Sequence, residues 1–265
     1  MSGNGKRIVS VCVALILLLL CGCGTVPPTE EENLPELIIG SDIYAPYFYI
    51  GDDGTFTGID VEIATEACRR LGYKAVFRQI QWQNKDEYLE NGTVDCLWGS
   101  FSMNGREDLY AWAGPYMYSR QIVVVHAESD IFTLSDLNGK RISVQSGSKP
   151  EELLLNHLIP EIGSVKAVYS FTTLDLVFSA LRKGYVDACA GHETAYKKYM
   201  EDMPENYRIL EESLLKARLG VAFYLRTGEG KAAEFAQILE QMKDDGSIAR
   251  IISEYGLNPA DYLTE

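Results

Sequence analysis

The stretch that follows position 93 constrains the fold of this chain most strongly. Residues Val94–Trp98 are mostly large and apolar, without amphipathic alternation, which predicts a short buried strand. Gly99, Ser100 and Ser102 follow the strand, and a single arginine, Arg106, comes after them. Small residues let a ligand approach the backbone, hydroxyls exchange hydrogen bonds, and the planar guanidinium of Arg106 matches a carboxylate. Because ligands of open α/β sheets bind beyond the carboxyl ends of the strands, the stretch predicts a binding loop. The alternative is that Arg106 only pairs with the acidic residues that follow it on a solvated loop.

This pattern occurs twice. Gly184–Gly191 repeats the spacing of Gly92–Gly99, with 92 residues between equivalent positions. Each copy follows a helix-like segment, and before the second copy one helix face carries Leu174, Val177 and Leu181. Each first glycine is well placed to end its helix, and each Val-Asp pair opens a buried strand. Two α/β units of similar plan predict two lobes, with a site in the crevice between them.

The N-terminus predicts export. Lys6 and Arg7 form a positively charged region, Ile8–Leu20 forms an apolar stretch too short for a comfortable membrane span, and Leu20–Cys23 reads as a lipobox. We therefore expect residues 1–23 to be a lipoprotein signal peptide, with the lipid on Cys23. The alternatives are an ordinary signal peptide cut elsewhere, or an anchor helix. Residues 24–36, rich in Pro and Glu at their start, read as a flexible tether.

Charge and cysteine content exclude several function classes. The formal net charge is −14, and loss of Lys6 and Arg7 with the signal peptide makes it −16, which argues against nucleic acid or an anionic lipid surface as a partner. Three cysteines remain in the exported domain, Cys68, Cys96 and Cys189, an odd number that predicts buried free thiols rather than a disulfide framework. No Cys-x-x-Cys motif or His cluster supports a metal site, and we expect no cofactor.

The remaining hydrophobic pattern predicts further elements. The expected helices are Asp60–Leu71, Asn84–Glu90 and a C-terminal helix around Phe235–Met242, and the expected strands are Leu37–Ser41, Ala75–Ile80, Ile122–Val125 and Arg141–Val144. The sequence from Ser148 to Glu151 fits a capping box, which predicts a helix start with the Ser148 hydroxyl on the Glu151 N–H.

Several ordered motifs resemble one known family. They are Ile38–Tyr47, Phe56–Ala64, Val94–Tyr116, Leu137–Val144 and Lys243–Gly256. Together they are similar to the family 3 solute-binding proteins, the polar amino acid receptors of ABC importers, such as the lysine/arginine/ornithine- and glutamine-binding proteins. The resemblance runs from about Leu37 to Tyr262. It implies an α/β, two-lobed periplasmic-binding-protein type II fold, with a ligand cleft between lobes joined by a two-strand hinge. The first lobe would comprise residues 37–118 and 220–265, and the second lobe residues 119–219.

The resemblance also implies roles for first-lobe residues. Arg106 matches the arginine that clamps the ligand α-carboxylate, once one residue is deleted from the preceding loop. Ser100 and Ser102 match polar contacts from the same loop, with simple turn capping as the alternative. Tyr44 and Trp82 match two aromatics that sandwich the ligand, although Trp82 could equally be a core residue.

Asp42 lies where relatives contact the ligand side chain, and one residue is missing between Asp42 and Tyr44. In the second lobe, Ser148 and Lys149 match a helix N-terminus that faces the ligand carboxylate. Lys149 departs from the usual hydroxyl residue, so it either adds charge to the site or points to solvent.

One position departs from the family more sharply. Relatives place an aspartate that binds the ligand ammonium where this chain has His192, with Glu193 beside it. A histidine cannot supply a fixed negative charge. Three readings stay open besides a purely structural histidine: Glu193 takes over, the ligand is not a standard α-amino acid, or neutral His192 accepts a hydrogen bond.

We therefore expect a lipid-anchored receptor on the outer face of the cell membrane. It would be a monomer that closes its lobes around a small polar solute, such as an amino acid or related carboxylate, and presents it to ABC permease subunits. One alternative is an enzyme like the cyclohexadienyl dehydratases of the same family, with Glu193 and His192 as the suspect acid–base groups. Another is a ligand sensor that acts through a partner protein.

Overall fold

One mixed β-sheet joins all parts of the compact unit Pro35–Glu265. The computed structural model describes residues 34–201 and 206–264, so the expected signal peptide, Cys23 and most of the tether lie outside the described residues. The strand order in the main sheet is β4-β1-β5-β11-β6-β9-β7-β8, with β10 (Tyr207–Ile209) paired to β6. A small hairpin pairs β2 (Tyr49–Ile50) with β3 (Phe56–Thr57).

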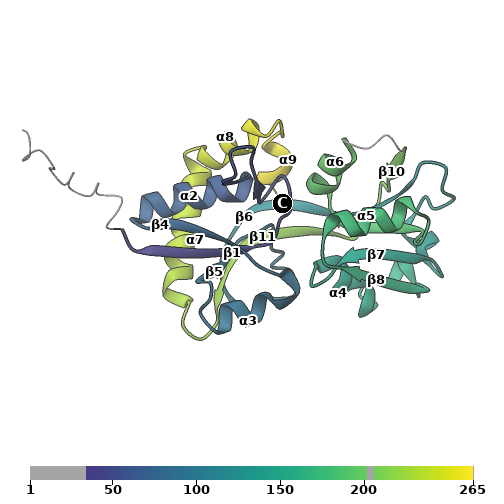
Figure 1. The fold of residues 1–265 in the computed structure, drawn as a ribbon, viewed down its shortest axis with the longest axis horizontal. Helices are drawn as coiled ribbons and strands as arrows, with labels where there is room; N and C mark the ends of the chain where they lie inside the picture. Colours follow the sequence, from purple (N-terminus) through teal and green to yellow (C-terminus); the bar gives the residue numbers. More distant parts are fainter. Residues whose placement is uncertain (1–33, 202–205, 265) are drawn as a thin grey trace, which may run out of the picture. The chain divides into compact units, whose positions relative to one another are not determined.

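The two central strands are long and belong to both lobes. They are β6 (Tyr110–His126) and β11 (Leu215–Tyr224), and they run antiparallel from one half of the sheet to the other (Figure 1). On one side β11 pairs with β5, and on the other β6 pairs with β9. We call the elements grouped around β1, β4 and β5 the first lobe, and those around β7, β8 and β9 the second lobe.

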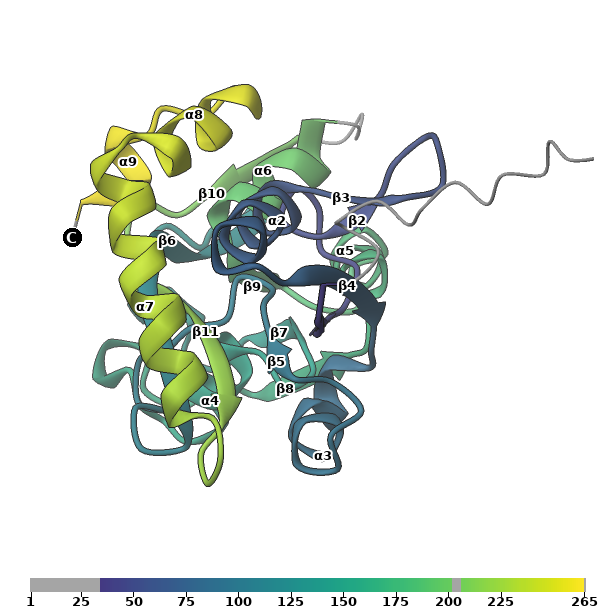
Figure 2. The ribbon, with the colours of Figure 1, turned by 90° about the vertical axis from the view of Figure 1, so that its left-hand side faces the viewer.

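The first lobe is a parallel sheet covered by helices. Its strands are β1 (Glu36–Ser41), β4 (Lys74–Gln79) and β5 (Cys96–Leu97). Helix α7 packs on β6 and β11, and α2 packs on β4, α7 and α8 (Figure 2). The helices are α2 (Ile59–Leu71), α3 (Lys85–Glu90), α7 (Glu229–Asp244), α8 (Ser247–Glu254) and α9 (Ala260–Leu263).

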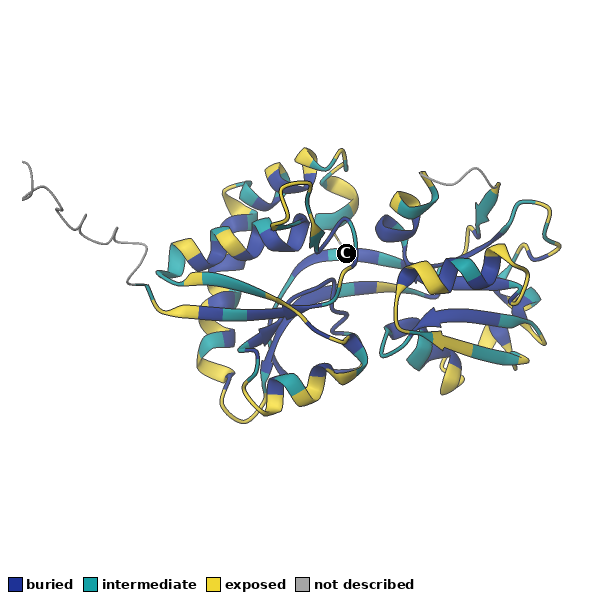
Figure 3. Ribbon diagram, viewed as in Figure 1, coloured by how far each residue is buried: buried dark blue, intermediate teal, exposed yellow. Residues whose placement is uncertain are grey.

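The second lobe repeats this plan on a smaller scale. Strands β7 (Arg141–Gln145), β8 (Ala167–Phe171) and β9 (Ala188–His192) are parallel to one another. Its helices are α4 (Lys149–Leu155), α5 (Leu174–Arg182) and α6 (Glu193–Glu201). The buried residues lie along the middle strands and the inner helix faces, while the outer faces of the helices are exposed (Figure 3). One buried hydrophobic cluster lies within the second lobe and one, around Trp82, lies within the first, while the largest runs through both lobes. The expected two-lobe α/β architecture is confirmed.

The sequence repeat corresponds to a repeated contact. In the first lobe the Asp95 carboxylate accepts the Ile38 N–H over 2.8 Å, and the Asp95 N–H donates to the Ile38 carbonyl. In the second lobe Asp187 makes the same pair of bonds with Arg141. Each aspartate thus ties the beginning of its own strand to the neighbouring parallel strand. This contact explains why the Gly-x-Val-Asp spacing occurs in both lobes.

Most predicted elements are present, with two differences in length. The expected strand at residues 94–98 forms ladder pairs only at Cys96–Leu97, because the chain turns at Gly99 into the next loop. The strand expected at Ile122–Val125 is far longer and begins at Tyr110. Gly114 and the proline after it resemble strand breakers, yet they form an irregular stretch opposite β11, and pairing resumes on both sides.

Two further findings concern the wider predictions. Cys68, Cys96 and Cys189 are buried and have free thiols, as expected. Within residues 34–201 and 206–264, no helix combines the length and the apolar character that crossing a membrane requires.

Candidate functional site: a cavity between the lobes

The loop after β5 is held in one conformation by the first-lobe core. A Cβ atom at Gly99 would lie 1.9 Å from the Ser41 hydroxyl oxygen, so only glycine fits there. Ser100 has a φ of 46°, in the left-handed region, and its N–H donates to the Asp60 carboxylate over 2.6 Å. The Tyr116 hydroxyl donates to the other oxygen of Asp60, and burial raises the pKa of this carboxyl to about 7. The buried acid therefore positions Ser100.

Arg106 is buried and faces the second lobe. Its guanidinium carbon lies 5.2 Å from the centre of the Phe101 ring, and Nη2 is 2.8 Å from Oε2 of Glu152 in α4. Glu107, the first of the acids that follow Arg106, pairs instead with Arg218 of β11. A buried guanidinium that reaches across to the other lobe is suited to hold a carboxylate between the lobes.

The second-lobe wall begins with the first turn of α4. The Ser148 hydroxyl accepts the Glu151 N–H, as the capping pattern predicts, while the Glu151 carboxylate accepts the Gly147 N–H over 2.6 Å. Lys149 is 5% exposed, so its side chain does not extend into solvent. Its ammonium pairs with Glu152, the same carboxylate that contacts Arg106. Two cations, one from each lobe, therefore share a single acid.

Aromatic rings form another part of the wall. Tyr44 is buried, and its hydroxyl oxygen accepts the His192 N–H of the second lobe over 3.3 Å. Trp82 packs edge-on against Phe101, with ring centres 5.0 Å apart, and the ammonium of Lys85 lies 5.5 Å from the centre of the Trp82 ring. Trp82 thus belongs to a hydrophobic cluster, as the core reading expects, and it also lines the cavity.

Asp42 is the acidic residue of the wall. Its carboxylate accepts a hydrogen bond from the Gln145 amide of β7, which is another contact between the lobes. Burial raises the pKa of Asp42 to about 6, despite the opposing effects of this hydrogen bond and of the Lys85 charge. The group is therefore mostly ionised at neutral pH and neutral in mild acid.

His192 lies at the end of β9 in a network of neutral groups. Its ring nitrogens are within 3.2 Å of the Gln121 amide nitrogen, and Nδ1 is 3.1 Å from the Ser119 hydroxyl. Ser119 also accepts a hydrogen bond from the Tyr47 hydroxyl. Burial lowers the pKa of His192 to about 3, and the nearby charge of Arg106 acts in the same direction. The imidazole is therefore uncharged at physiological pH.

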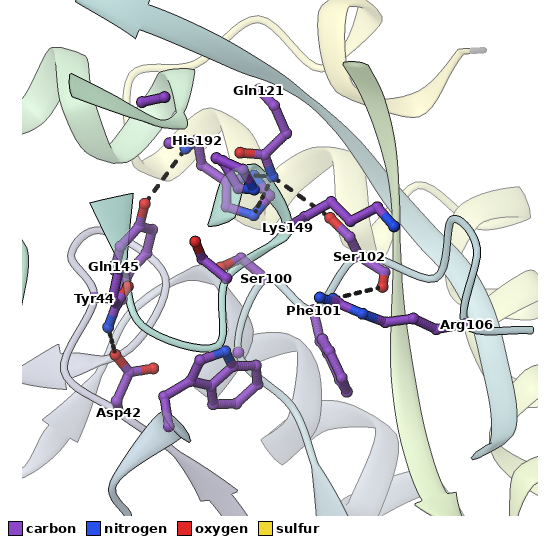
Figure 4. Close-up of a pocket in the computed structure, with 16 residues that line it drawn as sticks. Asp42, Tyr44, Ser100, Phe101, Ser102, Arg106, Gln121, Gln145, Lys149 and His192 are labelled. Atoms are coloured by element: carbon purple, nitrogen blue, oxygen red, sulfur yellow. Dashed lines mark hydrogen bonds between the residues drawn. The ribbon is translucent and has the colours of Figure 1, made fainter. Parts of the chain in front are cut away.

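These groups surround one cavity between the lobes (Figure 4). Nine of the ten residues that the sequence singles out for ligand binding line it, with Glu193 as the exception. The full lining consists of Asp42, Tyr44, Trp82, Gly99, Ser100, Phe101, Ser102, Arg106, Gln121, Gln145, Ser148, Lys149, Pro150, Ala190, Gly191 and His192.

Glu193 lies elsewhere. It is the first residue of α6, and its carboxylate is 2.9 Å from the Lys197 ammonium and 3.6 Å from the Arg120 guanidinium. These three residues line a different cavity. His192 lines the cleft cavity and Glu193 lines this other one, so the two residues do not converge on one ligand. Among the described residues, no group of three or more His, Cys, Asp or Glu side chains could hold a metal ion.

Sequence reasoning missed two glutamines of the wall. Gln145 ends β7 in the same way that Ser100 follows β5, so its place at the carboxyl end of a strand could have identified it. Gln121 is fully buried next to the apolar run Ile122–Val125. The only sign of its role in the sequence is that a polar residue stands beside such a run.

Comparisons with known proteins agree with this architecture. The L-cystine-binding protein TcyA of Bacillus subtilis (strain 168) is 26% identical over 260 residues, covering 92% of this chain and 93% of that protein. The lysine/arginine/ornithine-binding periplasmic protein of Escherichia coli (strain K12) is 25% identical over 251 residues, covering 91% of this chain and 95% of that protein. A crystal structure with bound L-arginine has a TM-score of 0.77 at 28% identity, covering 84% of this chain and 92% of that one.

The family comparison covers nearly the whole described chain. Residues 37–258 match the bacterial extracellular solute-binding proteins, family 3. This range includes both lobes, the two central strands and all the residues that line the cavity. The chain therefore belongs to the family 3 extracellular solute-binding proteins of bacteria.

Proposed function

We propose that this protein is the substrate-binding lipoprotein of an ABC importer, and that it captures a small polar carboxylate of the amino acid type between its lobes. The cation pair in the cavity carries this proposal. Arg106 and Lys149 are 8% and 5% exposed, and both contact one carboxylate, that of Glu152. Burying a cation without full compensation is unfavourable. A ligand carboxylate would supply the missing negative charge at the point where the two lobes meet.

Contacts across the cleft support capture by lobe closure. Gln145 donates to Asp42, and the His192 N–H donates to Tyr44, so each lobe supplies groups that the other needs. A ligand that touches both walls favours the closed arrangement over an open one, because it binds that arrangement more tightly. The function is therefore a shift in conformational population that a membrane permease can read.

The remaining parts of the proposal come from the sequence and the relatives. We assign residues 1–23 as signal peptide, residues 24–36 as tether, and Cys23 as the lipid anchor on the outer face of the cell membrane. The receptor would act as a monomer on ABC permease subunits. The relatives include proteins named for binding cystine, arginine and lysine, which supports an amino acid or a related carboxylate as ligand.

We propose a binding protein and not an enzyme. The acid–base pair that a dehydratase reading requires would be Glu193 with His192. Glu193 is ion-paired with Lys197 in another cavity, and the His192 pKa of about 3 is far from the value that a base at neutral pH needs. These observations favour a cleft that binds and releases its ligand unchanged.

A thermal-shift screen tests the proposal. The full-length protein would be heated with amino acids, hydroxy acids, amines and small carboxylates. A ligand present at a hundred times its dissociation constant should add about 2.7 kcal/mol of apparent stability. In Arg106→Ala, affinity should fall about tenfold to a hundredfold, because a charged hydrogen-bonded pair is lost. If no carboxylate in the panel stabilises the wild-type protein, or if Arg106→Ala responds like the wild type, the proposal is wrong.

A further inference from the structure

Charge is distributed unevenly around the cleft cavity. Arg106 and Lys149 supply two cations, whereas Asp42 is the only carboxylate among the described residues that line the cavity. In Figure 4, Asp42 and Arg106 lie on opposite sides of the labelled group, and His192 and Gln121 lie apart from Asp42. The wall therefore has a cationic region, an acidic region and a neutral polar region.

The neutral region has little to offer a positive charge. Both ring nitrogens of His192 are already engaged, Nδ1 by Ser119 and Nε2 by the amide of Gln121 at 2.9 Å. The Gln121 amide nitrogen can only donate, so Nε2 accepts its hydrogen bond, and Nδ1 carries the imidazole proton and donates it to Ser119. His192 thus has no lone pair free for a ligand ammonium. The charge of Arg106, which helps to keep the imidazole neutral, would also oppose an ammonium at this position.

Two backbone carbonyls nearby already accept hydrogen bonds. The Ser102 carbonyl accepts a hydrogen bond from Nη1 of Arg106 over 3.4 Å, and the Ala190 carbonyl accepts one from the Tyr196 hydroxyl. An ammonium has three protons to place, and a buried ammonium that lacks acceptors and a counter-charge is strongly disfavoured. The neutral region does not meet either need.

One acceptor in this region is free. Oε1 of Gln121 is fully buried and has no hydrogen-bond partner among the described residues. A buried acceptor without a partner is rare in native structures and needs an explanation. A ligand hydroxyl has one proton to donate, so it would satisfy this single oxygen without bringing a charge.

The Gln121 amide group lies close to Arg106, the proposed carboxylate clamp. The Gln121 amide nitrogen is 3.4 Å from the Ser102 hydroxyl, and Arg106 contacts the carbonyl of the same serine. A ligand whose carboxylate is held by Arg106 would therefore place its neighbouring substituent beside Gln121 and His192.

We propose that this cavity selects carboxylates that carry an uncharged hydrogen-bond donor next to the carboxylate, of the 2-hydroxy acid class, over the corresponding α-amino acids. This inference rests on the function proposed above. The sequence leaves several explanations open for a histidine at position 192. The inference adopts the explanation that the ligand is not a standard α-amino acid. Glu193 is excluded as a substitute acid by its ion pairs outside the cavity.

Calorimetry with matched ligand pairs tests the inference. Each pair has one side chain and differs only in the substituent next to the carboxylate: lactate and alanine, phenyllactate and phenylalanine, 2-hydroxyglutarate and glutamate, argininic acid and arginine. For the pair whose side chain fits, the full-length protein should bind the hydroxy acid at least tenfold more tightly than the amino acid. If the amino acid of that pair binds as tightly or more tightly, the inference is overturned.

Two variants place an acid in the neutral region. Gln121→Glu is isosteric and puts a carboxylate oxygen at the free acceptor, and His192→Asp puts one at the end of β9. Either should raise affinity for the amino acid and reverse the preference, whereas His192→Asn, which adds no charge, should keep the wild-type order. If both acidic variants fold and neither improves amino acid binding, the region does not read this substituent and the inference fails.

The same measurements separate the inference from the proposed function. Tight binding of an α-amino acid that is lost in Arg106→Ala would overturn the inference alone and leave the receptor function in place. If no member of any pair binds, and Arg106→Ala makes no difference, both are wrong.

Discussion

Arg106 and Glu152 link the two lobes directly, with Nη2 of the arginine 2.8 Å from Oε2 of the glutamate. Glu152 thereby occupies one edge of the guanidinium that a ligand carboxylate would use, and it also neutralises Lys149. The Glu152 carboxylate therefore takes the place at Arg106 that we propose for a ligand carboxylate. It lets the lobes contact each other while the cation on each wall remains partly compensated.

Glu152→Gln should therefore tighten carboxylate binding. A neutral amide competes less well for Arg106, and for a partly exposed ion pair the gain should be about twofold to fivefold. Calorimetric titration measures it. Glu107→Gln, which removes a half-exposed pair with Arg218, is the matched control and should leave affinity unchanged. Weaker binding by Glu152→Gln would show that the pair supports ligand binding and does not compete with it.

Asp60→Asn should change how stability depends on pH. The pKa of Asp60 is about 7 in the folded protein and 3.8 for the ordinary group, so the folded state keeps a proton that the unfolded state releases. The stability that Asp60 contributes is full below pH 3.8 and falls as pH rises towards 7. The variant lacks this loss, so its unfolding free energy relative to wild type should increase between pH 4 and pH 7.

Urea unfolding at several pH values would measure this trend. Asp187→Asn is a useful contrast, because hydrogen bonds and ion pairing with Arg141 lower the pKa of Asp187. The stability from that group is present above pH 3.8 and is lost as pH falls further, so its slope has the opposite sign. If the unfolding free energies of wild type and Asp60→Asn change with pH in parallel between pH 4 and pH 7, Asp60 does not titrate in this range.

Asp42 should make binding of basic ligands sensitive to pH. Its pKa of about 6 means that it is charged above this value and neutral below it. A ligand with a cationic side chain, such as argininic acid, should lose affinity as pH falls from 7 to 5, and Asp42→Asn should bind weakly with no such dependence. Phenyllactate has no cation and provides the control. If the affinity of Asp42→Asn for argininic acid still depends on pH, the titrating group is not Asp42.

Cys23→Ser should prevent lipidation, because the thiol is the expected acylation site. Metabolic labelling with a fatty acid analogue tests this directly, and Cys21→Ser is the neighbouring control that should still be labelled. Label that persists on Cys23→Ser would show that the lipobox is assigned to the wrong residue.

The sequence predicted the lobes well because their local signals agree with the tertiary contacts. The aspartates of the two repeats each tie one strand to its neighbour, so pattern and pairing coincide at Asp95 and Asp187. Strand β6 was underestimated because Gly114 and Pro115 are local breaking signals, which pairing with β11 on both sides overrides.

The cavity was predictable only where a side chain sits beside a strand end. Ser100, Arg106 and His192 follow or end strands, and the fold brings them to one cavity. Gln121 lies within a strand, and its role depends on the side chains that surround it, which no local pattern records. Glu193 was included because it adjoins His192, but β9 ends at His192 and Glu193 begins α6, where it pairs with Lys197 in another cavity.

The three buried cysteines allow local opening of the protein to be measured without an added label. Cys68 and Cys96 belong to the first lobe, Cys189 lies in β9 of the second, and burial raises the pKa of all three thiols. A thiol reagent can reach each one only when its surroundings unfold. The alkylation rates of these native thiols therefore measure the opening free energies of the two lobes separately. The extent to which a ligand slows each rate then reveals how its binding energy is divided between them.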